Sequence, residues 1–409
     1  MKNLYKILIL LTGFILSPCY AVATHHQCDA PFELSTIGSQ IVDQCGNKIK
    51  LKSVSWYGAH ETPQVPGGLD KQPMQNIVNL IKAGGFNSVR FTFSNQMLHD
   101  THSVDPNRIA ANPELINKTP LQVFDIAVKM LTDAGIIVIL NNHTTTSEWC
   151  CAYDFNGLWH HPRYQSTAQW LNDWVMMVTR YRHNPLVAGA DLRNEVRTGR
   201  YRDTYIPVNP NWGWGDENDW KLAATQAGNI IHEVNPHLLI IVEGINWTGI
   251  PMVNGYRPML TPVKNNPLIL NHSNKLVYEV HIYGYTGPTH TGDDASSRGQ
   301  KHYRDFDETA LKTVLDQQFG YVLENNHDYT APVWLGEFGV GYRSANEKDK
   351  LWFQRMVGYM LEKDLGWSFW ALNPVRADGT IEEFGLLTDD WSAYREDWRS
   401  PWIRRLLKG

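Results

Sequence analysis

The chain has 409 residues, of which 43% are hydrophobic and 19% are charged, and its formal net charge is −5. These values are typical of a folded protein with one large domain or two medium ones. The acidic balance argues against nucleic acid or an anionic membrane as the main partner. Tryptophan is unusually frequent, with 16 residues, and part of this set is expected to form flat surfaces on which sugar rings stack.

Residues 1–23 are predicted to be a secretory signal peptide. Two early lysines precede an apolar stretch, Ile7–Leu16, that is too short to span a bilayer, and Ala21-Val22-Ala23 fits a small-x-small cleavage site. We therefore expect an exported chain that begins at Thr24 and has no membrane association once the signal is removed. A lipoprotein signal that uses Cys19 is the alternative.

Four cysteines follow the predicted signal, and an exported chain can oxidise them. Cys28 and Cys45 flank residues 32–44, which are predicted to form a short hairpin within an N-terminal segment, 24–48, that packs on the main domain. Their pairing is the one we favour. Cys150 and Cys151 are adjacent in sequence, and for them both a vicinal disulfide and two free thiols stay open.

After the hairpin, apolar strands alternate with helical patterns. Strands are predicted at 49–59, 86–94, 136–143, 187–195, 238–244, 275–283, 332–340 and 366–374. Helices are predicted at 74–85, 120–135, 167–183, 216–234, 307–324, 347–364 and 394–407, with only a weak helix after the fifth strand. Most strands are continuously apolar, which is typical of a parallel sheet covered on both sides. Eight such units favour an α/β fold, a single (β/α)8 TIM barrel over 49–409, and an open doubly wound sheet is the alternative.

Polar side chains gather at the carboxyl ends of the predicted strands. They are Arg90, Asn142, His143, Asn194, Glu195, His281, Tyr283, Glu337, Trp370 and Asn373. In a barrel these ends meet in one cup. Two carboxylates in an aromatic-lined cup indicate glycoside hydrolysis, in which one carboxyl donates a proton and the other attacks the anomeric carbon. A separation of about 5–5.5 Å would predict retention of configuration.

Several of these segments resemble a known family. "SVRFTFS", "DLRNEVR", "VYEVHIYG", "WLGEFG" and "SFWALNP" occur in an order that resembles glycoside hydrolase family 5, the cellulase family, over roughly residues 35–375. "WCC" with "FNG" shortly after it, at 149–157, resembles a branch of cellulase-like proteins from plants and some microbes. One departure is Val196, which stands where the family usually has proline after the catalytic Asn-Glu pair.

The resemblance implies a role for each matched position. Glu195 matches the acid/base and Glu337 the nucleophile. Arg90 matches the arginine that keeps the nucleophile charged, an opposite-charge effect. Asn194 matches the amide that holds the sugar 2-hydroxyl.

Four further positions match residues of the substrate site. His143 and Trp370 match the histidine and the stacking floor of the cleaved sugar's subsite. His281 and Tyr283 match the pair next to the acid/base and the nucleophile. Candidates for outer sugar platforms, from predicted rim strands and loops, are Trp56, Trp149, Trp159, Trp212, Trp214 and Trp247.

The sequence thus predicts a secreted, monomeric, retaining β-glycosidase that acts on a β-linked polysaccharide or oligosaccharide, with endo-β-1,4-glucanase as the expected activity. The mechanism requires no cofactor and no metal. The same chemistry on mannan, another β-glycan or a glycolipid is one alternative. A non-catalytic carbohydrate-binding protein is an alternative of another class.

Overall fold

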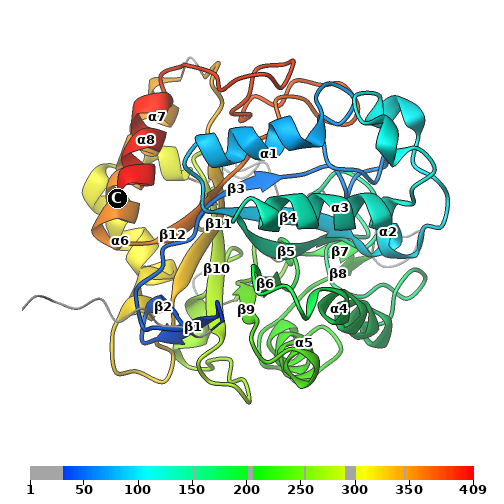
Figure 1. Ribbon diagram of the computed structural model, residues 1–409. Coiled ribbons are helices and arrows are strands. Elements are labelled where there is room, and N and C mark those ends of the chain that lie inside the picture. The colour runs from blue at the N-terminus through cyan, green and yellow to red at the C-terminus, as the bar shows by residue number, and fades with distance from the viewer. Residues whose placement is uncertain (1–30, 152, 201–205, 253–254, 291–300, 345) are drawn as a thin grey trace, which may run out of the picture.

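A computed structural model describes residues 31–409 except 152, 201–205, 253–254, 291–300 and 345. Eight parallel strands close into a barrel in the order β10-β11-β12-β3-β4-β5-β6-β9 (Figure 1). These strands are β3 (Lys52–Trp56), β4 (Ser88–Ser94), β5 (Ile137–Thr144), β6 (Val187–Asp191), β9 (Leu239–Glu243), β10 (Leu276–Tyr283), β11 (Val333–Gly339) and β12 (Gly366–Phe369). The predicted TIM barrel is confirmed.

Helices surround the barrel. They are α1 (Met74–Ala83), α2 (Asn95–His99), α3 (Pro120–Asp133), α4 (Thr167–Tyr181), α5 (Trp220–Val234), α6 (Glu308–Gln318), α7 (Glu347–Glu362) and α8 (Ser400–Lys408). Among the described residues between β9 and β10, the helical element is a 3-10 turn, Thr261–Lys264, as the weak pattern there indicated. None of the helices in the described part of the chain combines the length and apolar character needed to cross a bilayer.

Two helices begin later than the sequence pattern predicted. Helix α5 begins at Trp220 rather than 216, because the side chain of Asp219 accepts the N–H of Leu222 and so caps the helix there. Helix α8 begins at Ser400 rather than 394. The residues before it, from Trp391 to Arg399, are mostly bends and turns, and the buried guanidinium of Arg399 donates to the carbonyls of Val340 and Gly385.

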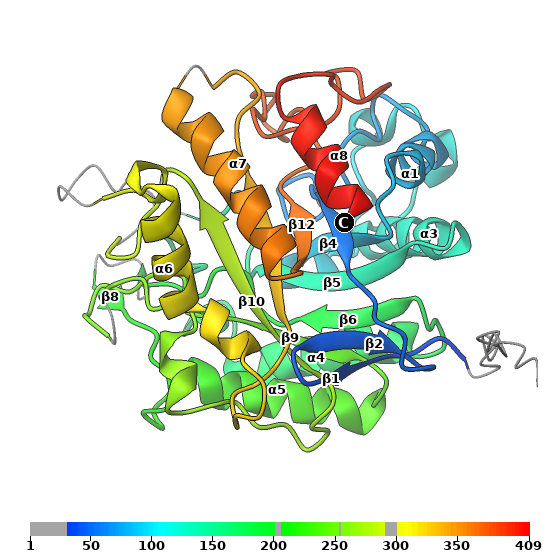
Figure 2. The same cartoon turned by 90° about the vertical axis from the view of Figure 1, so that its left-hand side faces the viewer.

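The predicted N-terminal hairpin is formed by β1 (Leu34–Ile37) and β2 (Gln40–Asp43). It packs against the end of the barrel where the strands begin, and Figure 2 shows it lying across that end. Cys45 is disulfide-bonded, whereas its predicted partner Cys28 lies outside the described residues, as does the predicted signal peptide.

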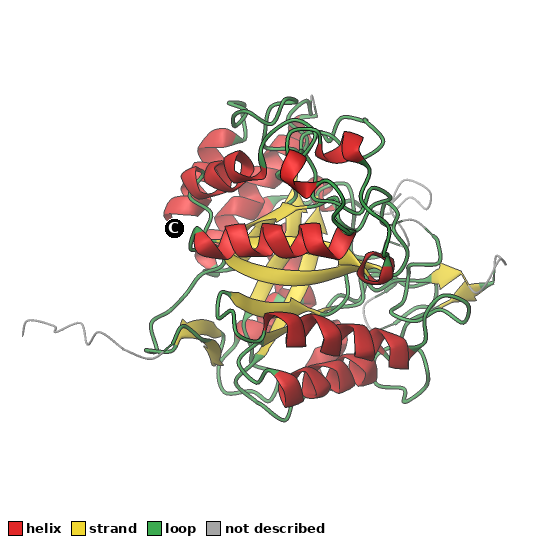
Figure 3. Cartoon of the chain, turned by 45° about the vertical axis from the view of Figure 1, so that its right-hand side comes forward, coloured by secondary structure: helices red, strands yellow, loops and turns green. Residues whose placement is uncertain are grey.

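The opposite end of the barrel carries longer loops. The loop after β6 contains a small antiparallel ribbon, β7 (Gly199–Arg200) and β8 (Pro207–Val208), which the sequence pattern did not predict. Figure 3 shows this ribbon on the far side of the barrel from the N-terminal hairpin. The polar strand ends therefore lie on the face that these loops surround, away from the hairpin.

Candidate active site

A cleft of about 190 Å³ opens among the carboxyl ends of the barrel strands. Five of the predicted site residues line it, and so do the adjacent cysteines: the lining includes His143, Cys150, Cys151, Glu195, Tyr283, Glu337 and Trp370. Arg90, Asn194 and His281 lie directly beneath, fully buried. The structure thus brings together all eight residues to which the family resemblance assigns a role.

Arg90, on β4, links the other groups. Its Nη1 donates to Oε1 of Glu337 at 2.6 Å, its Nη2 to Oδ1 of Asn194 at 2.7 Å, and its Nε to Oδ2 of Asp191 at 2.7 Å. Oε1 of Glu279 lies 3.3 Å from the same Nε. A guanidinium without solvent contact needs such partners, and these carboxylates raise its pKa, against the effect of burial.

Glu337, on β11, accepts a hydrogen bond on each carboxylate oxygen. Arg90 donates to Oε1, and the hydroxyl of Tyr283 donates to Oε2 at 2.8 Å. Tyr283 comes from the neighbouring strand β10, where His281 pairs with Glu337 in register. Two donors on two strands therefore hold the carboxylate in one orientation.

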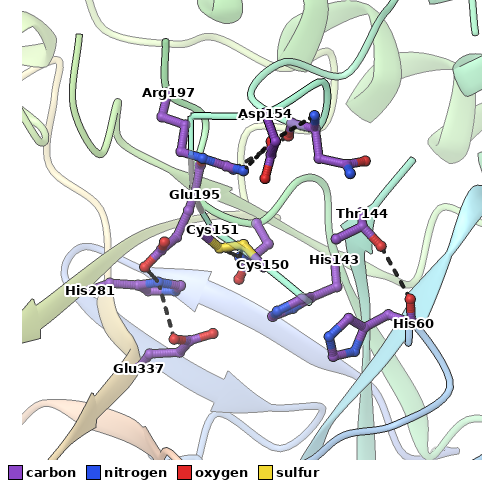
Figure 4. Close-up of a disulfide and its surroundings, with 12 residues drawn as sticks. His60, His143, Thr144, Cys150, Cys151, Asp154, Glu195, Arg197, His281 and Glu337 are labelled. Carbon is purple, nitrogen blue, oxygen red and sulfur yellow. Dashed lines mark hydrogen bonds and ion pairs between the residues drawn. A yellow bond between two sulfur atoms is a disulfide. The ribbon is translucent and has the colours of Figure 1, made fainter. Parts of the chain in front are cut away.

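Glu195 lies beyond the end of β6, which stops at Asp191 rather than at 195 as predicted. Its backbone has a left-handed φ of +43°, and its N–H donates to the buried carboxylate of Glu243. Oε1 of Glu195 pairs with Nδ1 of His281 at 3.0 Å. One oxygen of Glu195 lies within 4.8 Å of one oxygen of Glu337, and Figure 4 shows the two carboxylates on either side of His281.

His281 lies among carboxylates. Its Nδ1 faces Glu195, and its Nε2 lies 3.0 Å from Oε1 of Glu279. Burial lowers the pKa of His281, but the surrounding carboxylates, Glu243 and Glu337 foremost, raise it well above its ordinary value. The imidazole is therefore charged at neutral pH and balances part of the negative charge.

The two candidate catalytic carboxyls experience opposing effects. Burial raises the pKa of Glu337, against the lowering by His281 and Arg90. Burial also acts to raise the pKa of Glu195, but the hydrogen bond and charge of His281 outweigh it, so that this pKa is lowered. If the two carboxyls share one proton, these pKa shifts alone would place it on Glu337.

Hydrogen-bond geometry instead favours a proton on Glu195. Both oxygens of Glu337 already accept from donors, so a proton there would face Arg90 or Tyr283. Among the described residues, His281 is the side-chain donor found at Glu195. Carboxyls this close titrate as a pair, and the carboxyl with fewer donors is the better place for the common proton.

Aromatic rings line one side of the cleft. Trp370 stacks on Tyr57, with ring centroids 4.9 Å apart and planes 5° apart, and on His143 at 5.6 Å. His143 in turn pairs through Nδ1 with Oδ1 of Asn141 at 2.7 Å. The ring of His60 lies 4.0 Å from that of His143, and burial lowers the pKa of His60 to about 3.

The tryptophan candidates for sugar platforms divide by exposure. Trp149 is 36% exposed and lines the cleft, and Trp214 is 60% exposed. The prediction is wrong for Trp56 and Trp159, which are 0% and 1% exposed and belong to the core between barrel and helices. Trp212 and Trp247 are also buried.

Several groups at the site were missed in the sequence. They are His60, Asp191, Glu243 and Glu279. Two of these residues could have been found from the sequence. Glu279 precedes His281 by two residues, the spacing of one strand face, and Glu243 lies at the carboxyl end of β9, the position that Glu337 has near the end of β11. Asn142 and Asn373, in contrast, are structural: Asn142 bonds Asn95 and Trp170, and Asn373 bonds the backbone of Tyr57.

Two groups of described residues have the types that bind metal ions: His143 with Cys150 and Cys151, and Glu195 with His281 and Glu337. In the first group the two sulfurs are joined in a disulfide and are not thiolate ligands. In the second, both oxygens of Glu337 accept hydrogen bonds. Neither arrangement offers the free ligands that a metal site requires.

Two facing carboxylates beside aromatic rings, at the carboxyl ends of a (β/α)8 barrel, form the arrangement expected of a glycosidase. A model of the cellulase family, glycosyl hydrolase family 5, matches residues 42–376. The chain belongs to this family and is an enzyme that hydrolyses glycosidic bonds.

Known proteins resemble the chain over most of its length. An endoglucanase of Paenibacillus polymyxa is 30% identical over 410 residues, which cover 100% of this chain and 95% of that protein. The major extracellular endoglucanase of Xanthomonas campestris pv. campestris is 30% identical over 366 residues, covering 88% and 68%. A structure of the endocellulase from Pyrococcus horikoshii with cellotetraose aligns with a TM-score of 0.73 at 27% identity, covering 93% of this chain and 100% of that one.

Proposed function

We propose that this protein is a secreted, monomeric, retaining endo-β-1,4-glucanase in which Glu337 is the nucleophile and Glu195 the acid/base. The observation that carries the mechanism is the approach of the two carboxylates to within 4.8 Å. This separation fits a retaining enzyme, since an inverting one needs about 6.5–9.5 Å to admit a water molecule.

In the first step, Glu337 attacks the anomeric carbon while Glu195 protonates the departing glycosidic oxygen. Arg90 and Tyr283 orient the Glu337 carboxylate, which favours attack from a single direction. In the second step Glu195 takes a proton from water, and the water releases the sugar from Glu337 with net retention.

The remaining residues bind the sugar. Trp370 and His143 form stacked faces beside the carboxylates, suited to the C–H face of a pyranose. Asn194, held by Arg90, is placed to bind the 2-hydroxyl, whose hydrogen bond strengthens in the transition state.

The endo mode is supported by the shape of the surface. The catalytic cleft adjoins a second cavity of about 610 Å³, and Trp149 and Arg376 line both. A polymer can therefore extend past the cleaved unit. The names of the Paenibacillus and Xanthomonas relatives support a β-1,4-glucan as the substrate, and the signal-like residues 1–23 support export.

The test is hydrolysis of a panel of purified β-glycans and aryl β-glycosides, with the anomer released first identified by NMR. We expect cello-oligosaccharides from cellulosic substrates and β-configured first products. Mannan as the sole substrate would keep the chemistry and change the specificity. No release from any substrate, with binding retained, would favour the carbohydrate-binding alternative.

Two variants separate the roles of the glutamates. Glu337→Ala should lower kcat by more than about 10³-fold, and azide should restore turnover with an inverted glycosyl azide. Glu195→Ala should spare substrates with good leaving groups more than poor ones, because protonation matters least for them. The opposite pattern would exchange the two roles.

A further inference from the structure

A disulfide between neighbouring residues lies inside the cleft. Cys150 and Cys151 follow β5, are joined to each other, and both line the cleft together with Trp149. Cys150 is 7% exposed and Cys151 is half-buried. Figure 4 shows the two sulfurs in the space between Glu195 and His143. The family roles described above use neither cysteine.

The sulfurs contact one residue of the proposed mechanism. The amide nitrogen of Asn194 lies 3.4 Å from Sγ of Cys150 and 3.4 Å from Sγ of Cys151. Its amide oxygen accepts from Arg90 at 2.7 Å. An arginine can only donate, so the oxygen must face Arg90 and the NH₂ group must face the sulfurs. The Asn194 side chain is fully buried, and its orientation is determined from both sides.

The oxidised state of the sulfurs matters for this contact. Disulfide sulfurs carry no hydrogen and act only as weak acceptors, so the NH₂ group of Asn194 faces them as a donor. Reduction adds two electrons and two protons, breaks the S–S bond and gives two thiols, whose sulfurs are no longer held together and whose S–H groups can themselves donate.

We propose that the Cys150–Cys151 disulfide is a positioning element of the catalytic subsite. It holds the Asn194 amide in the orientation that meets the sugar 2-hydroxyl, and its sulfurs form part of the wall beside that sugar. The inference rests on the proposed function, in which Asn194 binds this hydroxyl. Since that bond strengthens in the transition state, breaking the disulfide lowers kcat more than it raises KM.

The test compares oxidised and reduced full-length protein on an aryl β-cellobioside. Dithiothreitol supplies both electrons and becomes its own cyclic disulfide, and alkylation with mass spectrometry verifies that residues 150 and 151 are reduced. We expect kcat to fall about tenfold, the scale of one lost hydrogen bond, with little change in KM and recovery on reoxidation. Unchanged kcat in the verified reduced protein would overturn the inference.

Two variants serve as controls for other effects of the reductant. The double variant Cys150→Ser/Cys151→Ser should have the lowered kcat from the start and should not respond to dithiothreitol. Cys45→Ser removes the cysteine of the remote hairpin and should respond as fully as wild type. Loss of the response in Cys45→Ser would assign the effect to the hairpin and overturn the inference.

A double-mutant cycle tests whether the disulfide acts through Asn194. Asn194→Ala should lower kcat, and adding the two serine substitutions to it should lower kcat little further, because the group they position is gone. Additive losses would contradict a positioning role. An oxidised wild type that cleaves no aryl β-glycoside would instead overturn the proposed function, and this inference with it.

Discussion

Arg90 serves three partners through three different nitrogen atoms, and this geometry is specific to a guanidinium. A lysine carries its charge at one point and cannot donate to Asp191, Glu337 and Asn194 at the observed angles. Arg90→Lys is therefore expected to lower kcat by about 10²-fold or more. Steady-state kinetics on an aryl β-cellobioside measures the change.

A variant without the charge, Arg90→Met, has a signature in its pH profile. The charge of Arg90 lowers the pKa of Glu337, against the effect of burial. With methionine in its place the pKa of Glu337 rises, so the acidic limb of kcat/KM should move to higher pH. An acidic limb at the wild-type position would show that Arg90 does not support the charge of Glu337.

His60 makes stability depend on pH. Burial lowers its pKa to about 3, with a further lowering by the charge of Arg90. Below its unfolded pKa of about 6.5 the unfolded chain binds a proton that the folded protein does not, so stability falls as pH falls from 6.5 toward 3. Between pH 6.5 and 4.5 this costs about 2 kcal/mol.

His60→Asn removes that titration. Asparagine keeps a polar group near the position of Nδ1, which bonds the hydroxyl of Thr92 at 2.9 Å. Urea unfolding at pH 6.5 and 4.5 should show a smaller loss of the free energy of unfolding in the variant than in wild type. Equal losses would show that His60 does not contribute to acid sensitivity.

At the level of single residues, the sequence indicated which polar groups would lie together. Glu195, Glu337 and Arg90 could be singled out because they follow or end otherwise apolar strands, and the structure places them at one cleft. Exposure was harder to predict, since Trp56 and Trp159 occupy rim-like positions in sequence yet pack into the core. Which face of an apolar strand an indole covers depends on packing against helices that sequence order does not specify.

At the scale of elements, strand and helix types were predicted well and their ends less well. The fourth predicted strand extended to 195, whereas β6 ends at Asp191. The sequence of residues 192–195 suggests that the strand continues. In the structure, however, Glu195 has a left-handed backbone and its N–H bonds the Glu243 side chain, so this segment forms part of the site and not of the β-sheet. Such functional departures from local propensity are where prediction from sequence fails.

The loop that carries the disulfide is anchored to the segment after β6. Asp154 accepts from Arg197 at 2.7 Å, and Arg197 also donates to the backbone carbonyl of Glu195. Arg197 is fully buried, so removing the Asp154 carboxylate takes away one of the groups that balance its charge. This ion pair therefore joins the wall of the cleft to the backbone of Glu195, the proposed acid/base.

Asp154→Ala is expected to destabilise the fold by about 3 kcal/mol and to raise KM several-fold. Differential scanning calorimetry and steady-state kinetics measure the two effects. Asp133→Ala is the matched control, since Asp133 pairs with Lys129 on an exposed helix surface and should cost less than about 0.5 kcal/mol. Equal effects of the two substitutions would show that the buried Asp154–Arg197 pair contributes no more than the exposed pair.

At the scale of the whole molecule, the barrel separates chemistry from stability. The cleft lies at the carboxyl ends of the strands, and the N-terminal hairpin covers the other end. There Leu34, which is fully buried, packs into the apolar interior of the barrel, and Lys275 donates to Glu33 and to the carbonyl of Leu34. Eight βα units were sufficient to predict the barrel, whereas which of its ends the hairpin covers was not readable from the pattern.

This division predicts that damage to the hairpin changes stability and leaves catalysis intact. Leu34→Ala removes a fully buried side chain and should lower the free energy of unfolding by about 2–5 kcal/mol. At a temperature where the protein remains folded, kcat and KM should equal those of wild type, because the geometry of the cleft does not depend on the end of the barrel that the hairpin covers. Ile37→Ala in the same hairpin is the matched control, since Ile37 is 65% exposed and should cost little. A loss of kcat in folded Leu34→Ala would show that the two ends are coupled through the barrel.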